Sequence, residues 1–156
     1  MPLIVWYPNY VEDELISAVT ALAFASRTLE KALEQMTLPQ YRVLTIITNS
    51  PERASRIADD ANVTRPSMTG LVDGLVAKGW VTRSDVDGDR RGVSLAITPA
   101  GAEAYETARA AMGTAVQDLL GHADGKTARR ALDGLTALHG ALVARRDQNT
   151  TVGVGR

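Results

Sequence analysis

The sequence predicts a mainly α-helical fold that carries one small β-hairpin. Apolar residues recur every three or four positions over most of the chain, which is the period of a helix with one buried face. The period changes to two only between Trp80 and Ile97, as in short strands. Aromatic residues make up only 4% of the 156, so the core must be mainly aliphatic, which favours helix packing over a sheet sandwich. The length fits one domain, or a small module with appendages.

The first expected element is a long amphipathic helix from Val11 to about Met36. At 1.5 Å per residue it would be roughly 40 Å long. A small monomer does not need so long a helix, so we expect either a scaffold or a contact with a partner chain. Its apolar positions are Val11, Leu15, Val19, Leu22, Leu29, Leu33 and Met36.

Two short helices are expected next. Thr37 is a typical N-cap and Pro39 is favoured in a first turn, so a helix should begin here. The Asn-Ser-Pro of residues 49–51 ends it, because the residue before a proline disfavours helical backbone. The second short helix is expected over residues 55–61, with a turn at residues 62–63.

A third helix should follow the N-cap Thr64 and run to Lys78. Gly79 stands where a left-handed residue commonly ends a helix. Gly70 and Gly74 are expected on the exposed face, where each costs roughly 0.5–1 kcal/mol of stability relative to alanine. The buried face should consist of Met68, Leu71, Val72, Leu75 and Val76.

A β-hairpin is expected from strands at residues 80–85 and 93–97. The sequence between them, VDGDRRG at residues 86–92, is too short for anything but a hairpin loop. Thr98 and Pro99 then begin another helix by the same combination of cap and proline.

The remainder predicts two helices separated near residues 121–125. Arg145 and Arg146 lie in the last turn of the second helix, where positive charge is favourable. From residue 147 the chain is mostly Gly, Thr, Asn and Val, so the tail at 147–156 is expected to be disordered.

The helix expected at residues 55–61, the turn at 62–63, the helix that follows Thr64 and the β-hairpin together match a known way of docking on DNA. In that geometry the helix that follows the turn lies in the major groove, with its N-terminal residues at the base edges. Arg65 is suited to bind O6 and N7 of a guanine together. The exposed residues at this helix end are Thr64, Arg65, Pro66, Ser67 and Thr69.

The wing loop brings Arg90 and Arg91 together at a hairpin tip. Arginines in this position can enter the minor groove or bind phosphates, and Asp89 is expected to orient one of them. The alternative for this pair is an ordinary solvated turn. Its place directly after a helix-turn-helix favours the DNA-binding interpretation.

Three segments resemble the core of the MarR family of bacterial regulators: LVDGLVAKGWV, DGDRRG and LAITPAG. The resemblance covers roughly Leu38 to Glu106 in detail, and the flanking helices agree in order and length. It implies a winged helix-turn-helix, here residues 37–98, flanked by N-terminal (1–36) and C-terminal (99–146) dimerisation helices. This sequence departs from the family in one place, because such helices often carry an arginine or lysine where Gly70 and Gly74 stand.

The resemblance implies a homodimer that binds double-stranded DNA, most simply as a repressor. A cytoplasmic protein is expected separately, because the sequence has no membrane span and a poor signal-peptide pattern. Half-sites would lie one helical turn apart, on the order of 34 Å, in a pseudo-palindrome. Many members also bind a small aromatic effector, and Tyr41, Arg42 and Trp80 are the candidate pocket residues here. Ordinary core packing is the alternative role for these three. The aromatic cluster at Trp6, Tyr7 and Tyr10 is expected to be an arm that packs on the partner subunit.

Several other classes of function are disfavoured. The chain has no cysteine, which excludes disulfides and thiolate metal sites. His122 and His139 are the only histidines and lack metal-ligand spacing. No nucleophile elbow or nucleotide-binding glycine loop is found, so we expect neither an enzyme nor a cofactor. No segment is apolar enough to span a membrane. The net charge of −1 keeps one alternative open, a winged-helix dimer used for protein assembly without specific DNA binding.

Overall fold

The structure is a computed structural model that describes residues 10–49, 52–53, 57, 64–86 and 89–152. Its helices and strands follow the order expected from the sequence, with one further short strand. The helices are α1 (Tyr10–Ala32), α2 (Leu38–Asn49), α4 (Arg65–Ala77), α5 (Pro99–Leu120) and α6 (Gly125–Val152). The strands are β1 (Glu52–Arg53), β2 (Val81–Val86) and β3 (Asp89–Ile97).

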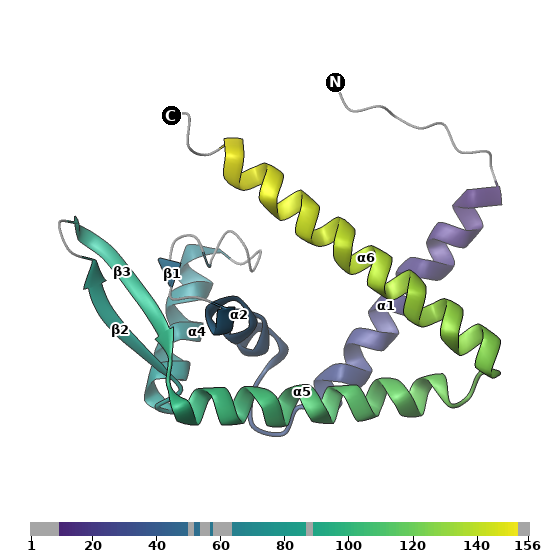
Figure 1. Ribbon diagram of the computed structural model, residues 1–156, viewed down its shortest axis with the longest axis horizontal. Coiled ribbons are helices and arrows are strands. Elements are labelled where there is room, and N and C mark those ends of the chain that lie inside the picture. The colour runs from purple at the N-terminus through teal and green to yellow at the C-terminus, as the bar shows by residue number, and fades with distance from the viewer. Residues whose placement is uncertain (1–9, 50–51, 54–56, 58–63, 87–88, 153–156) are drawn as a thin grey trace.

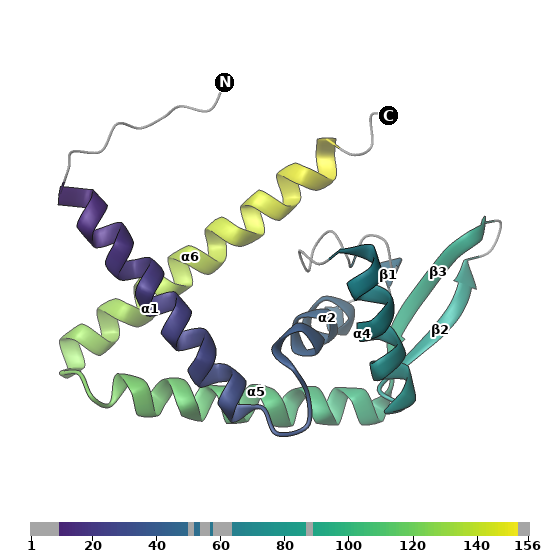
Figure 2. The same cartoon turned by 180° about the vertical axis from the view of Figure 1, so that it is seen from behind.

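Helix α5 connects two parts of the molecule (Figures 1 and 2). Helices α2 and α4 and the sheet gather around its first turns and form a winged-helix module. Helix α1 packs on α5, while α6 begins just past the far end of α5 and runs obliquely away from it; α1 and α6 form an extended helical arm. The prediction of a mainly α-helical winged helix-turn-helix between long flanking helices is confirmed.

The predicted helix starts are confirmed by their hydrogen bonds. The Thr37 hydroxyl accepts a bond from the Gln40 amide (3.3 Å), and the Gln40 side chain accepts one from the Thr37 amide (3.0 Å), which is a capping box. Thr64 caps α4, and Thr98 caps α5 by accepting from the Gly101 amide (3.0 Å). These bonds satisfy amide groups that a helix start otherwise leaves unpaired.

The sheet is antiparallel in the order β1-β3-β2. The two-residue strand β1 pairs with Leu95 and Ser94 of β3 and is absent from the sequence prediction. The pairing of β2 with β3 shifts between Asp85, which faces Val93, and Val86, which faces Asp89. Strand β3 consequently begins at Asp89, so residues 89–92 belong to a bulged strand and not, as expected, to the loop.

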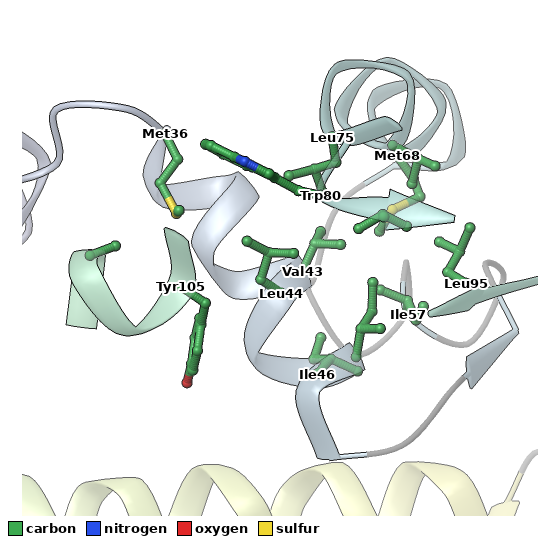
Figure 3. Close-up of a cluster of buried hydrophobic side chains, with 14 residues drawn as sticks. Met36, Val43, Leu44, Ile46, Ile57, Met68, Leu75, Trp80, Leu95 and Tyr105 are labelled. Atoms are coloured by element: carbon green, nitrogen blue, oxygen red, sulfur yellow. The ribbon is translucent and has the colours of Figure 1, made fainter. Parts of the chain in front are cut away.

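A single hydrophobic core lies inside the winged-helix module (Figure 3). Leu44, Ile57, Leu75 and Leu95 are all fully buried there, so α2, α4 and β3 are packed on one another. Trp80 joins this core just before β2. Ile57 is the one described residue of the short helix expected at 55–61; the rest of that prediction lies outside the described residues.

The C-terminal end of the chain differs from the expectation, and most of the N-terminal arm lies outside the described residues. Helix α6 runs to Val152, whereas the sequence predicts a disordered tail from residue 147. The six residues in question, DQNTTV, contain no glycine or proline, so nothing in them stops an existing helix from propagating. Trp6 and Tyr7 of the proposed aromatic arm lie outside the described residues, while Tyr10 begins α1.

Candidate nucleic-acid interface

Helix α4 presents one face to the core and one to solvent. Met68, Val72 and Leu75 are buried, with exposed fractions of 4%, 3% and 0%. Because these residues fix the helix on the module, the opposite face must point outward. The residues of that face with described side chains are Thr64, Pro66, Ser67 and Thr69, and all four are exposed.

The first turn of α4 combines hydroxyl groups with a helix N-terminus. The Thr64 hydroxyl accepts a bond from the Ser67 amide (3.4 Å) and shares another with the Ser67 hydroxyl (2.9 Å). The paired hydroxyls keep free lone pairs and can still bond to a base edge or a phosphate. The partial positive charge of a helix N-terminus favours an anion at the same place.

The predicted arginines are placed by their backbone alone. Arg65 is the first residue of α4, so it lies at the helix end that would meet the base edges. Asp89, Arg90 and Arg91 begin β3, at the loop end of the hairpin. The side chains of these four residues lie outside the described part of the structure, so their contacts with DNA stay predictions.

An ion pair that the sequence does not predict joins the hairpin to α4. Arg83 of β2 binds Asp73 of α4 through a guanidinium nitrogen and a carboxylate oxygen. Both side chains are largely exposed, at 41% and 58%. The pair joins the hairpin to the helix, and it depends on strand β2 folding back beside α4, which no local pattern reveals.

The two glycines of α4 are in different environments, although both are expected on the exposed face. A Cβ atom added to Gly70 meets no described atom within 4 Å, so Gly70 agrees with the expectation. Gly74 is half-buried, and a Cβ atom there would lie 3.2 Å from the side-chain nitrogen of Gln40. Gly74 therefore faces α2 in part, and a side chain here would press on the amide end of Gln40.

The structure does not bring the three candidate effector residues together around one cavity. Trp80 is buried in the core, and Arg42 is exposed to solvent. Tyr41 stacks on Tyr105 of α5, with ring centroids 5.1 Å apart and planes at 17°. Burial, and then the neighbouring Tyr105 hydroxyl, raise the pKa of Tyr41 to about 12. Tyr41 and Trp80 thus make the contacts of ordinary packed side chains.

A hollow of about 260 Å³ lies instead between α5 and the connection from α1 to α2. Its walls are mostly small and apolar, and the one described charge on them is the carboxylate of Glu34. Sequence periodicity does not locate it, because its alanines read as ordinary helix residues. It is lined by Ala32, Leu33, Glu34, Gln35, Met36, Ala104, Thr107, Ala108 and Ala111.

The described residues provide neither a metal centre nor a membrane segment. No group of three or more His, Asp or Glu side chains among them is arranged to hold a metal ion. None of the described helices has a stretch long and apolar enough to cross a membrane.

Comparison with known proteins agrees with this geometry. Residues 36–93 match the model of the MarR family. The fold is similar to that of apo MarR from E. coli, with a TM-score of 0.69 and 25% identity over 85% of this chain and 98% of that chain. It is also similar to CouR, a transcriptional repressor bound to a 23-mer DNA duplex, with a TM-score of 0.69 and 23% identity over 86% and 98%.

A MarR-family regulator from Rhodococcus sp. RHA1 gives a TM-score of 0.70 at 19% identity, over 85% of this chain and 96% of that chain. No curated protein sequence matches the chain. The likeness therefore extends over nearly the whole length of the solved structures, while the sequence match is confined to the winged-helix module.

Proposed function

Because residues 36–93 match the model of the MarR family, we propose that this chain is a transcriptional regulator that binds a specific double-stranded DNA sequence. The observation that carries the proposal is the exposed N-terminal face of α4 beside the β2–β3 hairpin. In winged helices this helix enters the major groove and the hairpin contacts the neighbouring backbone or minor groove. We call α4 the recognition helix and the hairpin the wing from here on.

The proposed contacts divide by type. Arg65 at the start of the recognition helix is assigned to a base edge, so Arg65→Ala should relax sequence preference at one position by about 1–3 kcal/mol. Arg91 in the wing is assigned to phosphate, so Arg91→Ala should weaken binding to all sequences and reduce its salt dependence. If both variants kept the parent affinity and preference, this docking arrangement would be wrong.

The proposed active form is a homodimer that represses by occupying its operator in the bacterial cytoplasm. Support comes from large apolar side chains that stand in solvent along α1 and α6, at exposed fractions of 40% to 72%. Monomeric proteins rarely leave so extended an apolar surface uncovered. A two-fold dimer would cover it and present two recognition helices to a pseudo-palindrome.

We further propose that a small effector releases the protein from DNA, and we propose no resident cofactor. Release requires a ligand that binds the DNA-competent and incompetent dimers with different affinities. The hollow beside α5 is the described space available for it. Thermal-shift and DNA-binding assays with aromatic acids would test this, and absence of coupling for every compound would leave a constitutive repressor.

The decisive test is selection from a random duplex library at moderate salt, followed by sequencing. Enrichment of a pseudo-palindrome with half-sites about ten base pairs apart would establish a dimeric, sequence-specific regulator. Absence of any enriched sequence would refute it.

The second candidate is a winged-helix dimer for protein assembly. One observation favours it, since Asp73 and Gly70 stand on the exposed face of the recognition helix, and no described side chain there is basic before Lys78. A heparin column separates the two functions, because an assembly module should flow through at low salt and a DNA-binding protein should be retained.

A further inference from the structure

Lys78 connects the C-terminal end of the recognition helix to the segment between α1 and α2. It is the C-cap residue of α4. Its ammonium group donates a hydrogen bond to the main-chain oxygen of Gln35 and lies 4.4 Å from the centroid of the Trp80 ring. Since Gln35 belongs to the connection between α1 and α2, one side chain links the arm, the recognition helix and the core.

The segment that Lys78 holds is also a wall of the hollow. Gln35 and Met36 line it on one side, and Ala104, Ala108 and Ala111 of α5 line it on the other. Met36 continues from this wall into the core, where it is 6% exposed and lies close to Trp80 (Figure 3). A change in the width of the hollow that moves the connection therefore displaces the group to which Lys78 is bonded.

The recognition helix is arranged to convert such a displacement into a tilt. It has 13 residues and is about 20 Å long. Lys78 is at one end, and the DNA-facing residues are at the other. Between them Gly74 faces α2, where an added Cβ atom would lie 3.2 Å from the side-chain nitrogen of Gln40, and the helix can pivot at this contact. A pull on Lys78 would then turn Thr64 and Arg65 in the opposite sense.

We infer that Lys78 is a positioning residue that couples the width of the hollow to the orientation of the recognition helix. The inference rests on the proposed DNA-binding function and adds the path by which the hollow would control it. A positively charged N–H donor is essential to this role, because it supplies both the bond to Gln35 and the attraction to the Trp80 ring.

A double-mutant cycle tests the coupling. Ala111→Met narrows the hollow from the α5 side and stands in for an occupant. Lys78→Met removes the charge and the hydrogen bond but keeps the apolar stem, while Lys78→Arg keeps the charge. Ala115→Met, one turn further along α5 and outside the lining, is the matched control. Circular dichroism verifies that each variant is folded.

With the selected operator, Ala111→Met should lower affinity about fivefold when residue 78 is Lys or Arg. The same substitution should lower affinity less than twofold in the Lys78→Met background, and Ala115→Met should have no effect that depends on residue 78. Equal losses in the parent and Lys78→Met backgrounds, or no loss in either, would overturn the inference.

A second readout needs no DNA and separates failure of this inference from failure of the proposed function. The chain has two tryptophans, so Trp6→Phe leaves Trp80 as the only one. Its emission responds to a charge held over the ring. Ala111→Met should shift this emission when Lys78 is present and not in the Lys78→Met background. A shift in neither background, or an equal shift in both, would refute the coupling even if the operator is bound as proposed.

Discussion

At the scale of single residues, a glycine in the first turn of α5 shows how tightly the winged-helix module is packed. A Cβ atom built on Gly101 would lie 2.1 Å from the main-chain oxygen of Trp80. Backbone cannot move aside as the end of a flexible side chain can. Gly101 is therefore required by the approach of α5 to the end of the recognition helix, and not by any special dihedral angle.

This close approach predicts opposite effects for two glycines of the same helix. Gly101→Ala should lower the free energy of unfolding by about 1–3 kcal/mol, because α5 must shift to relieve the overlap. Gly113→Ala, where the new Cβ meets no described atom within 4 Å, should raise it by about 0.5–1 kcal/mol through helix propensity. Urea unfolding measures both, and changes of the same sign would contradict this account.

The stacked pair of Tyr41 and Tyr105 predicts a pH dependence. The pKa of Tyr41 is about 12 in the folded chain and 10.0 in its ordinary state. The folded state then holds the proton more tightly, so the stabilisation is complete below pH 10 and is lost as the pH rises toward 12. Tyrosinate absorbance should show an ionisation near pH 12 that is lost in Tyr41→Phe. Its persistence in that variant would disprove the assignment.

At the scale of elements, helix boundaries are predictable from the sequence because caps act locally. Thr37, Thr64 and Thr98 each bond within three residues, so the pattern that marks them is also the contact that stabilises them. The strand β1 and the Asp73–Arg83 pair are not predictable in this way, because both depend on segments that meet only in the folded chain. The hollow is not predictable from the sequence for the same reason, because two separate segments enclose it.

The Asp73–Arg83 pair gives a prediction that distinguishes two roles of Arg83. An exposed pair of this kind contributes only about 0.2–1 kcal/mol to stability. If it orients the wing, Asp73→Asn and Arg83→Gln should both weaken operator binding. If Arg83 instead binds phosphate, Asp73→Asn should strengthen binding by freeing the guanidinium group. Fluorescence anisotropy with the selected operator at two salt concentrations decides between them.

At the scale of the whole molecule, the apolar stripe of α6 bears on the proposed dimer. Leu132, Leu135, Leu138 and Leu142 recur on one face and are each at least 40% exposed in the single chain. Such a stripe is the expected core of a helical dimer interface. The winged-helix module has its own buried core, so it should remain folded when the stripe is disrupted.

Leu138→Asp should accordingly convert the dimer to monomer and abolish tight operator binding, because a charge would be buried without a partner. Ala137→Asp, exposed on a different face of α6, is the control and should stay dimeric. Sedimentation velocity measures the assembly state. A dimeric Leu138→Asp protein would place the interface elsewhere.

The junction of the wing and α5 has a consequence for exchanging DNA-binding specificity between related regulators. The Thr98 amide donates to the Trp80 oxygen (3.0 Å), its hydroxyl donates to the Gly79 oxygen (2.7 Å), and Gly101 rests on the Trp80 backbone. A chimera joined at residue 98 would place a foreign helix start on these groups. The junction of a chimera should lie beyond Ala108, so that the donor protein supplies the first turns of α5 together with its winged-helix module.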